Sequence, residues 1–128
     1  MKKDNNGSAI LAMAKKDLRA LEGMVADREH FADEVFGFHA QQAVEKALKA
    51  WIAAMGKEYP FNHDISQLLG ILKTNGIAID EWMTLLELAG FSVQFRYEEL
   101  DLDDEPLDRT ALIDRIRQLI DRVAKEFC

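Results

Sequence analysis

The chain has 128 residues, of which 48% are hydrophobic, and its formal net charge is −7 at pH 7. This length suits a single domain over residues 1–128, in which folding buries roughly two-thirds of the extended surface. The one cysteine, Cys128, cannot form an internal disulfide, and no segment reaches the ~20 apolar residues of a membrane span. Because the N-terminal apolar run is too short for a secretory signal, we expect a cytoplasmic protein with no membrane contact.

Acidic residues are concentrated in one stretch, residues 97–108. It contains no Lys or Arg and holds seven acids, Glu98, Glu99, Asp101, Asp103, Asp104, Glu105 and Asp108. These seven account for the whole negative excess of the chain. An acidic surface disfavours non-specific nucleic-acid binding as the main activity. We expect residues 97–106 to form a solvated acidic loop and residues 1–7 to be a frayed terminus.

The first predicted helix begins after Ser8, a favourable N-cap, and its inward side chains are Ile10, Ala14, Leu18, Leu21 and Val25. A charged turn at 27–30 leads into the longest predicted helix, which begins near Phe31 and ends at Met55 with Gly56 as its C-cap. Apolar residues recur there at three- and four-residue steps and therefore share one stripe. The stripe consists of Phe36, Ala40, Ala43, Val44, Ala47, Leu48, Trp51, Ile52 and Met55.

Polar residues occupy the opposite, solvent-facing side of this second helix. They are Gln41, Gln42, Glu45, Lys46 and Lys49. Glu45 and Lys49 have the i,i+4 spacing of a helical ion pair, so we expect the two side chains to interact.

Three shorter helices are predicted to follow. Asn62 caps the third, Asp64 lies in its first turn, and Ile65, Leu68, Leu69 and Leu72 face inward. Asp80 caps the fourth, which has two apolar faces, one of Trp82, Leu85, Leu86, Ala89 and Val93 and one of Leu88, Phe91 and Phe95. The fifth starts at Pro106 and buries Leu112, Ile113, Ile116, Leu119, Ile120, Val123 and Phe127. The sequence thus predicts an all-α, five-helix, mostly antiparallel up-and-down bundle.

Several motif residues of a known family fall on these helices. Residues 38–50 read FHAQQAVEKALKA; Gly56, Pro60, His63-Asp64-Ile65 and Leu68-Leu69 follow, and Arg96-Tyr97 come at the end of the fourth helix. Over roughly residues 9 to 126 the chain resembles the HEPN domain family. The resemblance implies a helical bundle that commonly forms a homodimer. Many such proteins are encoded beside a minimal nucleotidyltransferase, and some of these pairs behave as toxin and antitoxin.

Other members of that family are metal-independent ribonucleases, which use an Arg followed after four to six residues by a His. Counted from Arg96, those positions hold Asp101, Leu102 and Asp103. The tyrosine that some partners modify, two residues beyond that His, is also replaced, by Asp103, Asp104 or Glu105. The chain therefore lacks the His that the ribonuclease pattern has after its Arg.

Arg96 and His63 are the candidate catalytic residues. Arg96 would stabilise a phosphorane, and His63 beside Asp64, or else His39, would act as base; His63 and Asp64 equally suit the start of a helix. The candidates for binding a nucleotide or phosphate are Gln42, Lys46, Lys49, Arg96 and Tyr97. Arg offers bidentate phosphate contact and Lys a point charge, although a solvated helix face with ion pairs to Glu45 explains the lysines as well. The histidines show no metal-ligand spacing, so we predict no metal and no cofactor.

Three functions remain open. The first is a non-catalytic, homodimeric HEPN-type module that binds a nucleotide or substrate, or a partner such as a minimal nucleotidyltransferase, in a toxin–antitoxin-like pair. The second is a metal-independent ribonuclease or toxin that uses Arg96 with a non-standard base and acts on RNA. The third is a structural interaction module. Two apolar faces on the fourth helix predict a symmetric dimer formed by parts of the second and fourth helices.

Overall fold

The structure is a computed structural model and describes residues 6–61, 64–86 and 108–127. Its longer helices are α1 (Gly7–Met24), α2 (Asp33–Ala54), α3 (Ile65–Thr74) and α5 (Arg109–Ala124). Two 3₁₀ turns, η1 (Asp80–Trp82) and η2 (Lys125–Phe127), complete the list, and residues 84–86 are also helical. The described ranges contain no strand, so the all-α prediction is confirmed.

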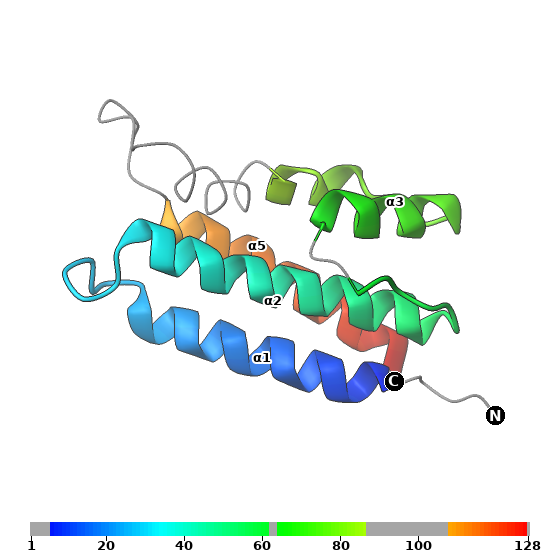
Figure 1. Cartoon of the computed structure of the whole chain (residues 1–128), viewed down its shortest axis with the longest axis horizontal. Coiled ribbons are helices and arrows are strands. Elements are labelled where there is room, and N and C mark those ends of the chain that lie inside the picture. The colour runs from blue at the N-terminus through cyan, green and yellow to red at the C-terminus, as the bar shows by residue number, and fades with distance from the viewer. Residues whose placement is uncertain (1–5, 62–63, 87–107, 128) are drawn as a thin grey trace.

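The helix α2 is the centre of the molecule, with α1, α3 and α5 packed against it (Figure 1). α5 also packs against α1, so α1, α2 and α5 are all in mutual contact and form the main layer of the fold. At one end of the bundle, Arg109 at the start of α5 bonds to Asp33 at the start of α2. At the other end, Gly7 at the start of α1 lies beside the ends of α2 and α5, since a Cβ added to Gly7 would lie 3.2 Å from Ala53 and 2.8 Å from Phe127. α1 is therefore antiparallel to both neighbours, whereas α2 and α5 run in the same direction.

The apolar stripes predicted from the sequence form the core. On α2 all nine predicted residues are buried except Met55, which is half-buried, and on α5 the stripe from Leu112 to Val123 is buried. On α1, Leu11 and Met24 are buried in addition to the predicted Ala14, Leu18 and Leu21, whereas Ile10 and Val25 are only partly buried. The buried residues of α1 differ from the predicted ones because α1 packs against both α2 and α5, and its buried side faces the line between these two helices.

The first two helices begin close to their predicted starts. α1 begins at Gly7 with Asn6 as N-cap, so Ser8 lies inside its first turn rather than capping it. α2 begins at Asp33 and ends at Ala54, two residues after the predicted start and one before the predicted end. Gly56 has φ of 77°, a left-handed conformation, as predicted for the residue that terminates this helix.

The starts of the later helices differ more from the prediction. Asp64, not Asn62, is the N-cap of α3, and its carboxylate accepts a hydrogen bond from the Gln67 N–H at 3.3 Å. Asp80 caps no long helix, because residues 80–82 form η1 and helical residues resume only at 84. α5 begins at Arg109, and its N-cap Asp108 accepts from the Ala111 N–H at 3.0 Å. Asn62 and Pro106 lie outside the described residues.

Two glycines of the α3 segment provide a matched stability test. Gly70 lies within α3, and a Cβ added there meets nothing within 4 Å. Gly70→Ala should raise the free energy of unfolding by about 0.5–1 kcal/mol, because Ala restricts the unfolded chain. Gly76 has φ of 92°, so Gly76→Ala should lower it by about 1 kcal/mol or more. Urea unfolding measures both, and equal shifts for the two variants would contradict this account.

Candidate functional site

The polar side chains predicted to bind phosphate lie along α2, where neighbouring residues already neutralise them. Lys46 Nζ donates to Asp17 Oδ2 of α1 at 2.8 Å, and the two side chains are 24% and 23% exposed. Lys49 Nζ donates to Glu45 Oε2 at 2.8 Å, which confirms the predicted ion pair. The same ammonium lies 5.7 Å from the centroid of the Tyr59 ring. Gln42 is half-buried on this helix.

The expected solvent exposure of this row of polar residues is wrong at Glu45, which is only 7% exposed. The physical reason is that α2 packs against α1, α3 and α5, so little of its circumference remains for solvent. A buried carboxylate requires a compensating charge, and Lys49 supplies it. A phosphate approaching either lysine would meet the negative charge of Asp17 or Glu45 beside it, which weakens the attraction.

Other predicted site residues lie outside this arrangement. Arg96, Tyr97 and His63 are outside the described residues, so their pairing with the α2 lysines stays a prediction. His39 is half-buried, with its ring edge-on to Phe38 at a centroid separation of 5.7 Å. Of the proposed phosphate-binding residues, the structure places Gln42, Lys46 and Lys49 together on one helix.

The Arg109 guanidinium, which sequence reasoning missed, is buried and donates hydrogen bonds through all three of its nitrogens. Its side chain is 1% exposed, at the first residue of α5. Nε donates to Asp33 Oδ1 at 3.0 Å, Nη1 donates to the Met24 carbonyl at 3.0 Å, and Nη2 donates to the Phe31 carbonyl. The guanidinium also lies 4.7 Å from the centroid of the Phe36 ring, a cation–π contact.

The sequence carries one signal for this role. Arg109 precedes Leu112 and Ile113 by three and four residues, so it lies on the buried stripe of α5 and not on its polar face. A cation is also unfavourable in the first turn of a helix because of the positive end of the dipole. The same charge is favourable at the C-terminal end of α1, where the Met24 carbonyl accepts from Arg109 as well as from the Asp27 backbone N–H.

The turn between α1 and α2 is tied to the same centre. Arg28 Nη1 donates to Asp33 Oδ1 at 2.7 Å, so this carboxylate receives two guanidinium groups. The Asp27 carboxylate accepts from the His30 backbone N–H at 3.0 Å, which holds the pKa of Asp27 below its ordinary value. The carboxylates of Asp27 and Asp33 therefore fix the conformation of this turn by accepting hydrogen bonds from nearby donors, which is a structural role.

Removal of the Arg109 side chain tests this centre. Arg109→Met should lower the free energy of unfolding by roughly 3–5 kcal/mol, because Asp33 and the Met24 and Phe31 carbonyls each lose a donor. Arg117→Met is the control: Arg117 pairs with Glu22 at 2.6 Å, but both side chains are about half exposed, so a loss below about 1 kcal/mol is expected. Guanidinium unfolding monitored by circular dichroism measures both. Similar losses in the two variants would contradict a special role for Arg109.

Two tryptophans and two arginines connect η1 to the core. Trp82 packs edge-on against Trp51 at a centroid separation of 6.5 Å. Arg115 and Arg122 of α5 lie over the two rings, 5.3 Å from the centroid of Trp82 and 4.6 Å from that of Trp51. Trp51 is 1% exposed, and its Nε1 has no hydrogen-bond partner among the described residues. These contacts hold η1 against α2 and α5.

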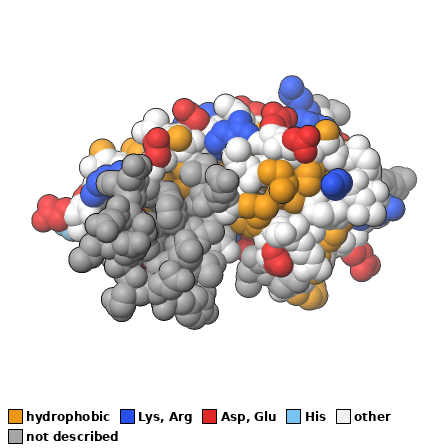
Figure 2. All heavy atoms as spheres, turned by 90° about the horizontal axis from the view of Figure 1, so that it is seen from above, with side chains coloured by type: hydrophobic (Ala, Val, Ile, Leu, Met, Phe, Trp, Pro, Cys, Tyr) orange, Lys and Arg blue, Asp and Glu red, His pale blue; other side chains and the backbone are white. Residues whose placement is uncertain are grey.

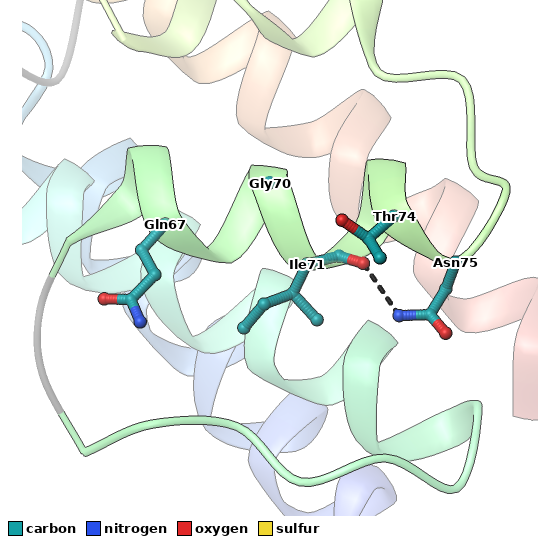
Figure 3. Close-up of a pocket in the computed structure, with 5 residues that line it drawn as sticks. All are labelled: Gln67, Gly70, Ile71, Thr74 and Asn75. Atoms are coloured by element: carbon teal, nitrogen blue, oxygen red, sulfur yellow. Dashed lines mark hydrogen bonds between the residues drawn. The ribbon is translucent and has the colours of Figure 1, made fainter.

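A surface hollow lies along α3 (Figure 3). Gln67, Gly70, Ile71, Thr74 and Asn75 line it, and all belong to α3 or its C-cap. Asn75 Nδ2 donates to the Ile71 carbonyl at 2.8 Å, which ends the helix. Because one helix alone lines the hollow and it holds no ionisable side chain, it lacks the converging groups of a catalytic pocket.

The part of the chain that the structure describes contains no group of three or more His, Cys, Asp or Glu side chains suited to hold a metal ion. Within the same residues, no helix combines the length and the apolar character needed to cross a membrane.

The helical architecture agrees with a family comparison. The family model of the HEPN domain matches residues 8–126, nearly the whole chain. The protein therefore belongs to the HEPN domain family. No curated protein and no solved structure matches the chain significantly.

Proposed function

We propose that this protein is a non-catalytic HEPN-type module. It acts as a homodimer, binds a nucleotide or another substrate, and works with a partner such as a minimal nucleotidyltransferase in a toxin–antitoxin-like pair. The observation that carries the proposal is the missing base after Arg96: Asp101, Leu102 and Asp103 occupy the places where ribonuclease members have His. Membership of the HEPN domain family supports the proposed class of module.

The chemistry of RNA cleavage explains why this replacement matters. Cleavage without a metal uses the ribose 2′-hydroxyl as nucleophile, so it needs a base for that proton and a cation for the phosphorane. Arg96 would supply the cation. A carboxylate at Asp101 or Asp103 is a poor base there, because its negative charge repels the phosphate that it must approach.

The ion pairs of α2 also favour a binding role over catalysis. Lys46 and Lys49 are each held by a carboxylate at 2.8 Å, so neither is a free cation beside a scissile phosphate. In this proposal Gln42, Arg96 and Tyr97 make the main contacts to the nucleotide, and the two lysines contribute long-range positive charge.

RNA cleavage assays test the absence of catalysis. With chelator present, purified wild-type protein should cut single-stranded RNA no faster than Arg96→Ala does. Arg117→Ala serves as a control for the loss of one arginine, since Arg117 is exposed and paired with Glu22. Cleavage by wild type and Arg117→Ala, but not by Arg96→Ala, would replace this proposal with the ribonuclease alternative.

Exposed hydrophobic side chains support association into a dimer. Phe61 is 94% exposed and Met83 is 42% exposed, and they flank α3 in the sequence. Figure 2 shows hydrophobic side chains gathered on the face of the molecule that carries α3. The sequence predicted a contact through parts of the second and fourth helices; this proposal moves the contact to the α3 face, where an isologous interface would remove Phe61 and Met83 from water.

Sedimentation measures the proposed dimer. We expect a dimer at tens of micromolar concentration, with Phe61→Ser raising the dimer dissociation constant at least ~10-fold through lost apolar burial. Met13→Ser is the control, since Met13 is 50% exposed but belongs to α1. A wild-type monomer at this concentration would contradict the dimer. Equal effects of both substitutions would contradict the α3 face as its interface.

Isolation of the native complex tests the partner. A tagged full-length chain should co-purify with a small nucleotidyltransferase encoded nearby. Recovery of the dimer alone would remove the partnership from the proposal and leave the binding module.

A further inference from the structure

The outer face of α1 carries three exposed cations, Lys15, Lys16 and Arg19. α1 lies at the edge of the bundle, with its neighbours on one side only (Figure 1). Lys15 and Arg19 are four residues apart, and Lys16 and Arg19 three, so all three project from adjoining positions. None of them forms an ion pair with another described residue.

The acidic residues of α1 do not offset this charge, because cations from other helices already bind them. Asp17 accepts from Lys46 of α2 at 2.8 Å, and Glu22 accepts from Arg117 of α5 at 2.6 Å. Glu22 is the one acid of α1 at helical spacing from Arg19, and no acid lies three or four positions from Lys15 or Lys16. The outer face is therefore a local positive surface on a chain whose net charge is −7.

Small side chains accompany the cations. Ala9, Ala12, Ala20 and Gly23 are exposed and recur along the same outer face. A Cβ added at Gly23 would meet nothing within 4 Å, and Met13, nearer the start of α1, is 50% exposed. Short side chains let a second helix approach the α1 backbone closely, while the longer Lys and Arg side chains reach around its sides.

We propose that the outer face of α1 is a docking site for an acidic helical segment of a partner protein. Carboxylates of the segment pair with Lys15, Lys16 and Arg19, and its backbone lies over Ala12 and Ala20. None of these residues belongs to the proposed nucleotide site, so this proposal does not rest on that function.

Two observations favour a polypeptide over a nucleic acid at this face. α1 contains no aromatic side chain on which a base could stack. The net charge of −7 repels a long polyanion more than a short segment that carries a few carboxylates. Met13 adds an apolar contact of the kind that protein interfaces use.

A labelled synthetic peptide of about 20 residues, with Glu at every fourth position in Ala, serves as the probe, since this length supports a helix. Fluorescence anisotropy at low salt should show binding to the full-length protein. The triple variant Lys15→Gln/Lys16→Gln/Arg19→Gln should weaken binding about tenfold, the combined effect of three exposed ion pairs. Ala12→Trp should weaken it several-fold by blocking close approach while leaving all charges in place.

The control variant is Lys57→Gln/Lys73→Gln/Lys125→Gln, which removes the same charge from three exposed lysines outside α1. It should bind the peptide within about twofold of wild type, and unchanged urea midpoints verify that each variant is folded. Equal weakening by both triple variants, or no binding to wild type, would overturn the proposal. Tighter binding of a 20-nucleotide polyuridylate, lost in the α1 triple variant, would overturn it in favour of a phosphate-binding surface.

Discussion

The buried guanidinium of Arg109 determines how the three long helices meet. A charge removed from water is stable in a protein only when nearly all of its hydrogen-bonding capacity is used. Here a carboxylate from α2, a carbonyl from the end of α1 and a carbonyl from the turn between them accept from one side chain of α5. Hydrophobic contacts alone would permit small rotations of α5, whereas three directional acceptors fix the position of its first turn.

Burial of α2 constrains the function in a similar way. A helix covered by three others keeps its polar residues only if they find partners, and Glu45 and Lys46 find theirs in Lys49 and Asp17. The row of polar residues that resembles a phosphate site in the sequence thereby contributes to holding α1 against α2. Neither lysine of the row is therefore a free cation, whereas Gln42, which carries no charge to neutralise, stays among the proposed nucleotide contacts.

The sequence predicted the fold where one physical effect dominates. Three- and four-residue spacing of apolar side chains located the buried stripes of α2 and α5 almost residue by residue, and Gly56 located the end of α2. The pattern failed where tertiary packing decides. Periodicity places Glu45 opposite the apolar stripe but cannot show that other helices cover that side too. The observed helix starts differ from the predicted ones because several polar residues near each start could serve as the N-cap. Contacts such as that of Asp64 with the Gln67 N–H decide which one does.

The candidate site was less predictable than the fold. Lys46 has no acidic residue three or four positions away on its own helix, and its partner Asp17 is 29 residues away in the sequence. Arg109 bonds to groups 76 to 85 residues away, and such distant pairings leave no local periodic signal. Its place on an otherwise apolar stripe was the one available clue, and a single charge on a stripe is easily read as an irregularity.

The position of Arg109 late in the chain has a consequence for its synthesis. A ribosome adds roughly 5–20 residues per second, and domains generally fold as units. α1 and α2 can pair as soon as residue 54 has emerged, but the acceptors at Met24, Phe31 and Asp33 lack their shared donor until residue 109 follows. Until then the apolar sides of α1 and α2 that face α5 remain open to water. The nascent chain therefore passes through a stage in which the α1–α2 hairpin exposes apolar surface, and chaperones that recognise such surfaces would act on it then.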